Sequence, residues 1–375
     1  MSAPVDQVDQ DLRAQVAALR QGAGAFVLPR DVFAVRGDDA TAYLQGQLSQ
    51  DVAALAIGDS ADSLLLQPDG KLTALLRVTR VDAQGFVLDT DAGFGDTMVA
   101  RLKKFLLRSK VEIERLEWRC LALRGAGVES AAAGLRAALA EAGVLDLPYE
   151  WNGWRGVDLL GPKDVVLDPT AAAGPRGTAA GPGGTAAGPR GTAAGRLPEG
   201  ILLCDRDATE ACRIASGIPA MGSELTDKTI AAEAGLVDRS VSFTKGCYTG
   251  QELVARLDSR GNNVPRRLVG VVGGSDGAAP SDAERLSFGM TLHAGSDPIG
   301  STDVATDKVV GTVTSAAWSA ELDAWVALAY LHRTVEAPGP VRVRSGDGLG
   351  GDRPARVAPL PLIDLPGVDL PGNSS

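Results

Sequence analysis

The chain has 375 residues, of which 45% are hydrophobic and 22% are charged, so it can bury large cores, and its length indicates two or three domains. Its net charge of −10 disfavours direct binding to DNA or tRNA outside a local basic patch, because both partners would be negatively charged. The sequence has no apolar run of about 18 residues that could span a membrane, and its first residues lack the basic-then-apolar pattern of a signal peptide. We therefore expect a cytoplasmic protein with reduced thiols and no membrane partner.

Hydrophobic periodicity predicts a mixture of helices and strands in the N-terminal part of the chain. The predicted helices cover residues 11–21, 38–49, 94–107 and 130–142. The predicted strands cover residues 26–35 with a break at Pro29, then 64–66, 72–81, 86–88, 111–113 and 116–123. The turn Pro68-Asp69-Gly70 joins two of these strands, because Pro, Asp and Gly each favour a turn conformation.

The middle of the chain contains one internal repeat. Gly-Thr-Ala-Ala-Gly recurs from Gly177, Gly184 and Gly191. These residue types cannot form a hydrophobic seam, so residues 170–196 are predicted to be a flexible surface insertion.

A further helix is predicted over 207–216. Short strands are then predicted over 268–272, 309–314, 325–331 and 341–343. This pattern indicates a C-terminal all-β unit, followed by a Pro/Gly/Ser-rich tail that we expect to be disordered.

Basic residues gather over 101–110 and at Arg266-Arg267. The helical spacing of the first group favours a solvated helix face over a nucleic-acid site. The four cysteines form no C-x-x-C pair and there are only two histidines, so the sequence predicts neither a zinc ribbon nor a His-based metal site. Three of the cysteines lie in apolar or helical stretches and are expected in the core: Cys120, Cys204 and Cys212.

The most informative motif runs from Lys245 to Glu252 and places Cys247 between a glycine and an aromatic residue. Thr249 and Glu252 fit a capping box, with Thr249 as the N-cap of a helix. Cys247 would then lie close to the positive end of that helix dipole, and Lys245 is near in sequence. Both features favour the reactive thiolate. The alternative is an ordinary tight turn that happens to contain a cysteine.

Lys-Gly-Cys-Tyr-Thr-Gly-Gln-Glu at 245–252, continued by Val-Ala-Arg at 254–256, resembles the signature of the YgfZ-type folate-binding proteins. These proteins are relatives of the glycine-cleavage aminomethyltransferase (T-protein), and their mitochondrial counterparts assist iron–sulfur cluster assembly. Further stretches are similar to the same family: 43–51, 66–78 with the Asp69-Gly70 turn, 101–111 and 219–238. The insertion 170–196 matches no part of the family pattern.

The resemblance implies an α+β chain with a three-domain, ring-like aminomethyltransferase (GcvT-like) fold and a C-terminal β-barrel domain. We expect a discontinuous first domain of residues 20–117 plus 213–264, which would bind folate. A second α/β domain would cover 118–212 and hold the insertion. The barrel would cover 265–360, and residues 361–375 would form the disordered tail.

The resemblance also implies a tetrahydrofolate site. Glu233 lies in the segment that carries the pterin-binding acid of the family, and a carboxylate can accept two adjacent N–H donors. Arg260 is the candidate arginine facing the folate, and Tyr248 and Gln251 are further candidate folate contacts. Cys247 and Lys245 are the candidate reactive pair.

One departure from the aminomethyltransferase pattern concerns the acid that faces the folate ring. The aminomethyltransferases carry an aspartate on the strand after the hairpin turn, and here that place reads Ala74 or Leu75. Without a carboxylate, nothing at that place would position or activate the folate amine. The sequence therefore leaves open whether the chain is an enzyme.

Three functions remain at this point. The first is a tetrahydrofolate-binding accessory protein that supports iron–sulfur cluster assembly or repair through Cys247, with iron–sulfur proteins or assembly factors as clients and an indirect effect on tRNA modification. The second is a folate-dependent aminomethyltransferase or other one-carbon transferase. The third is a module that senses folate without chemistry.

Overall fold

The computed structural model describes residues 5–167, 169, 197–273, 285–295, 308–345 and 352–363. The predicted insertion 170–196 and residues 364–375 of the predicted tail lie outside this part. By its contacts the chain divides into two units, Met1–Arg30 with Leu116–Thr209, and Asp31–Arg115 with Glu210–Ser375. One boundary between the units falls inside helix α6.

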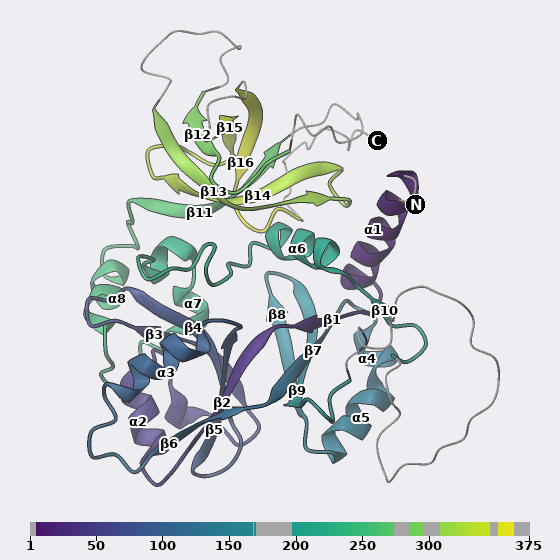
Figure 1. The fold of residues 1–375 in the computed structure, drawn as a ribbon. Coiled ribbons are helices and arrows are strands. Elements are labelled where there is room, and N and C mark those ends of the chain that lie inside the picture. Colours follow the sequence, from purple (N-terminus) through teal and green to yellow (C-terminus); the bar gives the residue numbers. More distant parts are fainter. Residues whose placement is uncertain are drawn as a thin grey trace, which may run out of the picture. The chain divides into compact units, whose positions relative to one another are not determined.

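Unit 1 is built on a five-stranded sheet with the order β10-β1-β7-β9-β8. β1 pairs with β10 in parallel and with β7 in antiparallel fashion, and β7, β9 and β8 continue antiparallel (Figure 1). Residues from β1, β7, β9 and α5 form its core. The bounds are α1 (Val5–Arg20), β1 (Gly24–Leu28), β7 (Trp118–Arg124), α4 (Val128–Ala131), α5 (Ala133–Glu141), β8 (Leu145–Trp151), β9 (Trp154–Pro162) and β10 (Leu202–Leu203).

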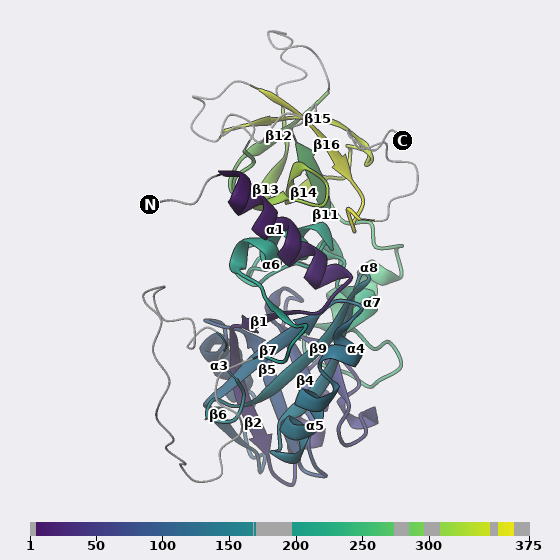
Figure 2. The same cartoon turned by 90° about the vertical axis from the view of Figure 1, so that its right-hand side faces the viewer.

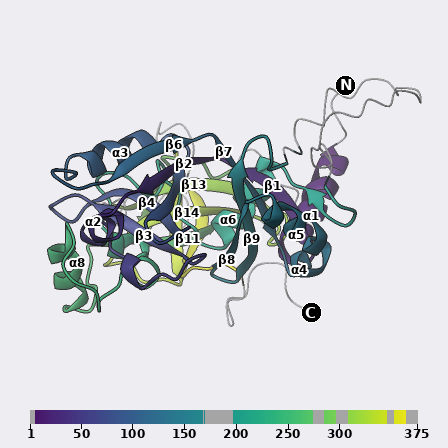
Figure 3. The ribbon, with the colours of Figure 1, turned by 90° about the horizontal axis from the view of Figure 1, so that it is seen from below.

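The first half of unit 2 is a second five-stranded sheet, with the order β3-β4-β5-β2-β6. Figures 1 and 3 show α2, α3 and α8 at the same end of this sheet. Its strands are β2 (Arg30–Arg36), β3 (Ser60–Leu66), β4 (Leu72–Arg80), β5 (Gly85–Asp91) and β6 (Glu112–Leu116). The helical elements of unit 2 are α2 (Ala40–Gln47), η1 (Val52–Ala54), α3 (Gly95–Lys103), η2 (Ala231–Ala234), α7 (Val237–Ser240) and α8 (Gln251–Asp258), together with the part of α6 (Arg206–Ala215) from Glu210 on.

The second half of unit 2 is a closed barrel with the strand order β11-β14-β13-β12-β15-β16 (Figure 2). Closure leaves no sheet edge unpaired, and the inward-facing side chains fill the interior. That core is aliphatic, with Val271, Leu292 and Val313 fully buried in it. The strands are β11 (Arg266–Gly273), β12 (Thr291–Ala294), β13 (Val309–Ser319), β14 (Ala324–His332), β15 (Gly339–Arg344) and β16 (Arg353–Ala358).

The α+β fold class with a C-terminal barrel is confirmed, but some predicted boundaries differ. Residues 20–30 were expected in the first domain, whereas β1 pairs along its whole length with β7 and belongs to unit 1. The helix predicted over 94–107 ends at Lys103. There the hydroxyl of Tyr43 donates to the Leu102 carbonyl (2.6 Å), which is the acceptor that the next helical turn would use.

Candidate functional site

The segment between α7 and α8, residues 242–250, is termed the Cys loop. Cys247 is exposed on it, whereas Cys120, Cys204 and Cys212 are buried as predicted. Phe243 is also exposed there, at 52% of its surface. The loop therefore presents one thiol to solvent, which is the access that a reactive cysteine requires.

Lys245 attaches the Cys loop to the end of α2. Its Nζ donates to the backbone carbonyls of Gln45 (2.6 Å), Leu48 (2.6 Å) and Gln50 (3.0 Å). It also lies 5.0 Å from the ring centroid of Tyr248. Burial lowers the pKa of Lys245 to about 8. All three ammonium donors are used by carbonyls, so the structure gives Lys245 an anchoring position in the loop.

The predicted capping box is wrong. α8 begins at Gln251, its N-cap is Gly250, and no side chain caps it. Thr249 instead donates its backbone N–H to the Gly46 carbonyl (3.1 Å), and Tyr248 N–H donates to Gln251 Oε1 (3.1 Å). Gly250 replaces a capping side chain because its φ of +85° makes a turn that other residues rarely adopt.

The start of α8 lies tightly against the turn after β3. A Cβ on Gly250 would come within 2.5 Å of the Gln67 carbonyl oxygen, and a Cβ on Gly70 within 2.5 Å of Leu253 Cβ. Gly70 also has a positive φ, +83°. Two glycines are therefore required where the turn meets the helix, and this contact fixes where the Cys loop ends.

Glu233 is 4% exposed and lies in η2. Its Oε2 accepts a hydrogen bond from Arg266 Nε at 3.0 Å, and the Arg266 guanidinium lies 4.4 Å from the ring centroid of Tyr330. Among the described residues, no donor reaches the second carboxylate oxygen of Glu233. The arrangement is a buried carboxylate that retains acceptor capacity for a ligand with N–H donors.

Arg266, not Arg260, is thus the arginine in contact with Glu233. Arg260 is exposed after the last turn of α8, and its role in folate binding stays a prediction. In the sequence, Arg266-Arg267 stands out only as a basic pair near the start of the predicted barrel domain. Arg266 lies 33 residues after Glu233, so their pairing depends on tertiary packing.

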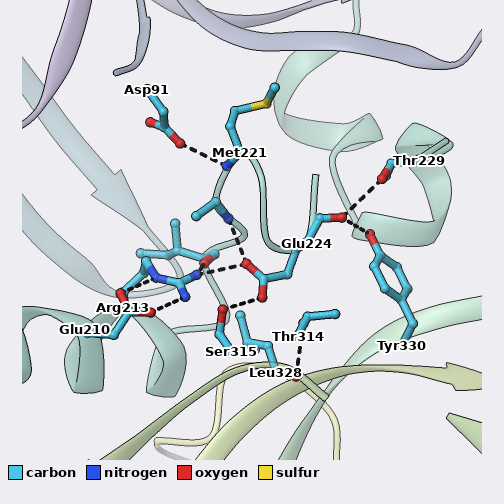
Figure 4. Close-up of polar contacts among 12 residues, drawn as sticks. Asp91, Glu210, Arg213, Met221, Glu224, Thr229, Thr314, Ser315, Leu328 and Tyr330 are labelled. Carbon is cyan, nitrogen blue, oxygen red and sulfur yellow. Dashed lines mark hydrogen bonds and ion pairs between the residues drawn. The ribbon is translucent and has the colours of Figure 1, made fainter. Parts of the chain in front are cut away.

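A second carboxylate, Glu224, is the centre of a saturated network (Figure 4). Its oxygens accept from Ser315 Oγ (2.6 Å), from Arg213 Nη1 (3.1 Å) and from Ala220 N–H (2.9 Å). Its own backbone carbonyl accepts from the hydroxyl of Tyr330 (3.0 Å) and from Thr229 Oγ1. Glu224 therefore ties α6, its own loop and barrel strands β13 and β14 together, and its carboxylate is fully used for structure.

Ala74 lies in β4 with no exposed surface, and Leu75 follows it. The Leu75 N–H donates to the sulfur of Met221 (3.5 Å), and Met221 N–H donates to Asp91 Oδ2 (3.0 Å). The position in β4 where a T-protein is expected to carry an aspartate is therefore apolar here. Asp91, the acid at the end of these contacts, accepts a hydrogen bond from the Met221 backbone N–H.

The basic segment 101–110 is only partly a solvated face. Arg101 is 7% exposed, and its guanidinium donates to the Leu66 carbonyl and to Gln47 Oε1 (3.1 Å). Lys103 and Lys104 are exposed, as the sequence predicted. Within the described residues, no group of three or more His, Cys, Asp or Glu side chains is arranged to hold a metal ion, and no helix is long and apolar enough to cross a membrane.

Comparison with known proteins places the barrel in a family. Residues 266–364 match the family model of the glycine cleavage T-protein C-terminal barrel domain. The solved glycine cleavage system aminomethyltransferase T from Bartonella henselae has a similar fold, with a TM-score of 0.68 at 21% identity over 94% of this chain and 89% of that one.

Sequence relatives extend the likeness beyond the barrel. The tRNA-modifying protein YgfZ of Serratia proteamaculans is 28% identical over 88% of both chains, and an aminomethyltransferase of Thermus thermophilus is 26% identical over 92% of this chain and 88% of that protein. An uncharacterized protein of Haemophilus influenzae is 25% identical over 61% of this chain, and that match spans 66% of its own length, just under two thirds.

The match of the barrel and the similarity to a solved aminomethyltransferase show that the chain has the aminomethyltransferase fold. Within that class, residues 266–364 belong to the T-protein C-terminal barrel family, and the chain as a whole is similar to YgfZ proteins and to aminomethyltransferases.

Proposed function

We propose that the chain is a tetrahydrofolate-binding accessory protein that supports the assembly or repair of iron–sulfur clusters in client enzymes through Cys247. A role linked to tRNA modification would then be indirect, because a tRNA-modifying enzyme that depends on a cluster would lose activity without it. Relatives named tRNA-modifying protein YgfZ support this proposal.

The residues around Glu233 fit a reduced folate. A pterin edge presents adjacent N–H donors, and the Glu233 carboxylate has one oxygen that accepts nothing from the described residues. Arg266 holds the other oxygen through an ion pair of 3.0 Å. Glu233 would bind the pterin, with Arg266 orienting it.

The exposed thiol carries the proposal. Cys247 is the one exposed cysteine of four, on a loop that Lys245 anchors at three carbonyls. Because a cluster usually needs four thiolates, a single thiol would share iron or sulfur with ligands of a client. The anchored loop would hold Cys247 ready for that contact, and Lys245 would position the loop.

The test compares two variants in a strain that lacks its own copy of the gene. Cys247→Ser should keep the fold and folate binding but fail to restore the activity of cluster-dependent enzymes. Thr244→Ser, an exposed hydroxyl residue in the same loop, is the matched control and should restore it. Full restoration by Cys247→Ser would refute the role of the thiol.

Folate binding is tested separately by calorimetry with reduced folates. Glu233→Gln and Arg266→Lys should weaken binding, and Arg260→Lys serves as the comparison that decides which arginine contributes. Unchanged affinity in Glu233→Gln would remove the folate assignment and leave the thiol role untouched.

The second candidate is an aminomethyltransferase, favoured by relatives of that name that match over most of the chain. The apolar Ala74 weighs against it, because no carboxylate stands there to position the folate amine. Turnover of glycine-cleavage intermediates with a lipoyl carrier protein would establish it. The third hypothesis, a folate sensor without chemistry, is supported instead if Glu233→Gln abolishes complementation while Cys247→Ser does not.

A further inference from the structure

The segment that leads out of α3, residues 103–108, exposes apolar side chains among cations. Leu107 is 84% exposed and Phe105 is 41% exposed. Lys103, Lys104 and Arg108 are exposed around them, and within the described part of the chain no acidic side chain pairs with these three cations. This local surface is basic and apolar in a chain whose net charge is −10.

The segment is fixed before any partner arrives. On its N-terminal side, Arg101 is buried against the Leu66 carbonyl and Gln47, at the end of α2. On its C-terminal side, Lys110 N–H donates to Asp39 Oδ2 (2.7 Å), at the start of α2. The segment therefore runs along α2 with both ends held, so a partner would bind it with little ordering cost.

The backbone at Arg108 carries a further sign of constraint. Its φ is +67°, in the left-handed region that residues other than glycine adopt rarely. Such conformations gather at functional positions. Here the unusual turn follows directly after Leu107, the most exposed large apolar side chain of the segment.

The same end of α2 also holds the Cys loop. Arg101 binds the side chain of Gln47, and the carbonyl of the preceding residue, Gly46, accepts from Thr249 N–H. The start of the 103–108 segment and the end of the Cys loop are thus both connected to the last residues of α2, through Arg101 and Thr249. A protein that covers the segment and extends past this end of α2 would reach the Cys loop.

We infer that residues 103–108 form a docking surface for an acidic protein segment with apolar anchors, and that this segment belongs to the client presented to Cys247. The inference rests on the proposed function for the identity of the partner as a client. Exposed Leu107 and Phe105 would pack against apolar side chains of the partner, and the three cations would attract the acidic side chains around them. A nucleic acid fits less well, because Leu107 is not aromatic, the Phe105 ring already carries the Arg101 guanidinium 4.2 Å from its centroid, and the chain as a whole repels phosphates.

The experiment uses the full-length chain in cells. Leu107 is replaced by photoreactive p-benzoylphenylalanine, and adducts formed on irradiation are identified by mass spectrometry. Leu202, an exposed apolar residue of unit 1, is replaced in the same way as the control position. Protein adducts with Asp/Glu-rich contact peptides are expected at position 107 and not at 202. Charge reversal of Lys103, Lys104 and Arg108 to Glu should reduce them by about tenfold.

Other outcomes overturn the inference. Nuclease-sensitive adducts would mean a nucleic-acid surface. Adducts that persist after charge reversal, or none at all, would mean that no acidic partner docks there. Leu107→Ser, which leaves the charges in place, should also reduce complementation. If the charge-reversed chain folds and complements fully while Cys247→Ser does not, the docking inference fails and the proposed function stands.

Discussion

Glu224 and Glu233 lie in one connecting segment of unit 2, and both carboxylates are almost completely buried, yet their surroundings differ. Glu224 accepts from a guanidinium, a hydroxyl and a backbone amide, so it has little capacity left for a ligand. Among the residues that the structure describes, Glu233 accepts from Arg266 and from no other side chain. Buried carboxylates are normally saturated by protein partners, so the unsaturated one is the better candidate for recognising an external group.

Tyr330 connects the two regions. Its hydroxyl donates to the Glu224 carbonyl, and its ring lies beside Arg266, which holds Glu233. Burial raises the pKa of Tyr330 well above its ordinary value, so the hydroxyl remains a donor. The region around Glu224 thus supports the region around Glu233. Variants that change one region and not the other test whether the two carboxylates have different roles.

The largest effect is expected from Glu224→Ala. Removing the carboxylate leaves part of the half-buried Arg213 guanidinium, Ser315 Oγ and the Ala220 amide without their acceptor. Breaking such a buried pair should lower stability by about 3 kcal/mol. Urea denaturation measures it. Glu210→Ala, which removes the more exposed partner of Arg213, should cost about 1 kcal/mol or less. Equal losses of stability in the two variants would contradict the structural role assigned to Glu224.

Next comes Glu233→Gln. The amide keeps the shape but loses the charge and one acceptor oxygen, so tetrahydrofolate affinity should fall by about tenfold to a hundredfold, as expected for a lost charge-assisted hydrogen bond. Calorimetry measures it, with the exposed Glu252→Gln of α8 as control. Stability should change less than in Glu224→Ala. A large loss of stability with unchanged affinity would reverse the roles of the two glutamates.

A smaller effect is expected from Tyr330→Phe. The Glu224 carbonyl keeps the hydrogen bond from Thr229 Oγ1 (3.1 Å), so losing the Tyr330 hydroxyl should cost about 1 kcal/mol. The ring beside Arg266 is retained, so folate affinity should stay within about twofold of the parent chain. Loss of affinity without loss of stability would place the hydroxyl in the ligand site.

The smallest effect concerns pH. Lys245 has a pKa of about 8 in the folded chain, against an ordinary value of 10.5. Between these values the unfolded chain binds the extra proton, so the contribution of Lys245 to stability rises with pH. Relative to Lys245→Met, the parent chain should therefore gain stability from about pH 7 to about pH 10. Melting temperatures over this range measure it. A difference that stays constant or shrinks would mean that folding does not lower the pKa of Lys245.

The sequence predicted much of the fold because local patterns set it. Apolar patterns predicted strands that overlap all five strands of the unit 2 sheet and four of the six barrel strands. The β8–β9 hairpin was missed, although its Asn152-Gly153 turn is a strong hairpin signal and both residues have positive φ. Pro148 inside β8 weakened that pattern, and it is tolerated because β8 is an edge strand.

The candidate site was less predictable because its contacts are long-range. Cys247 could be singled out from its motif, and the structure shows that its side chain is exposed. The carbonyls that bind Lys245, and the pairing of Arg266 with Glu233, come from segments distant in sequence. The capping box failed for a different reason: a close backbone approach at Gly250 overrode a favourable local pattern.

That close approach also bears on protein engineering. Because Gly250 and Gly70 each leave no room for a side chain, the eight-residue signature cannot be transplanted alone into another scaffold. A graft would have to bring the hairpin turn and the carbonyl-bearing end of α2 with it. The smallest transferable module is therefore a three-part assembly drawn from residues 45–50, 66–71 and 242–253.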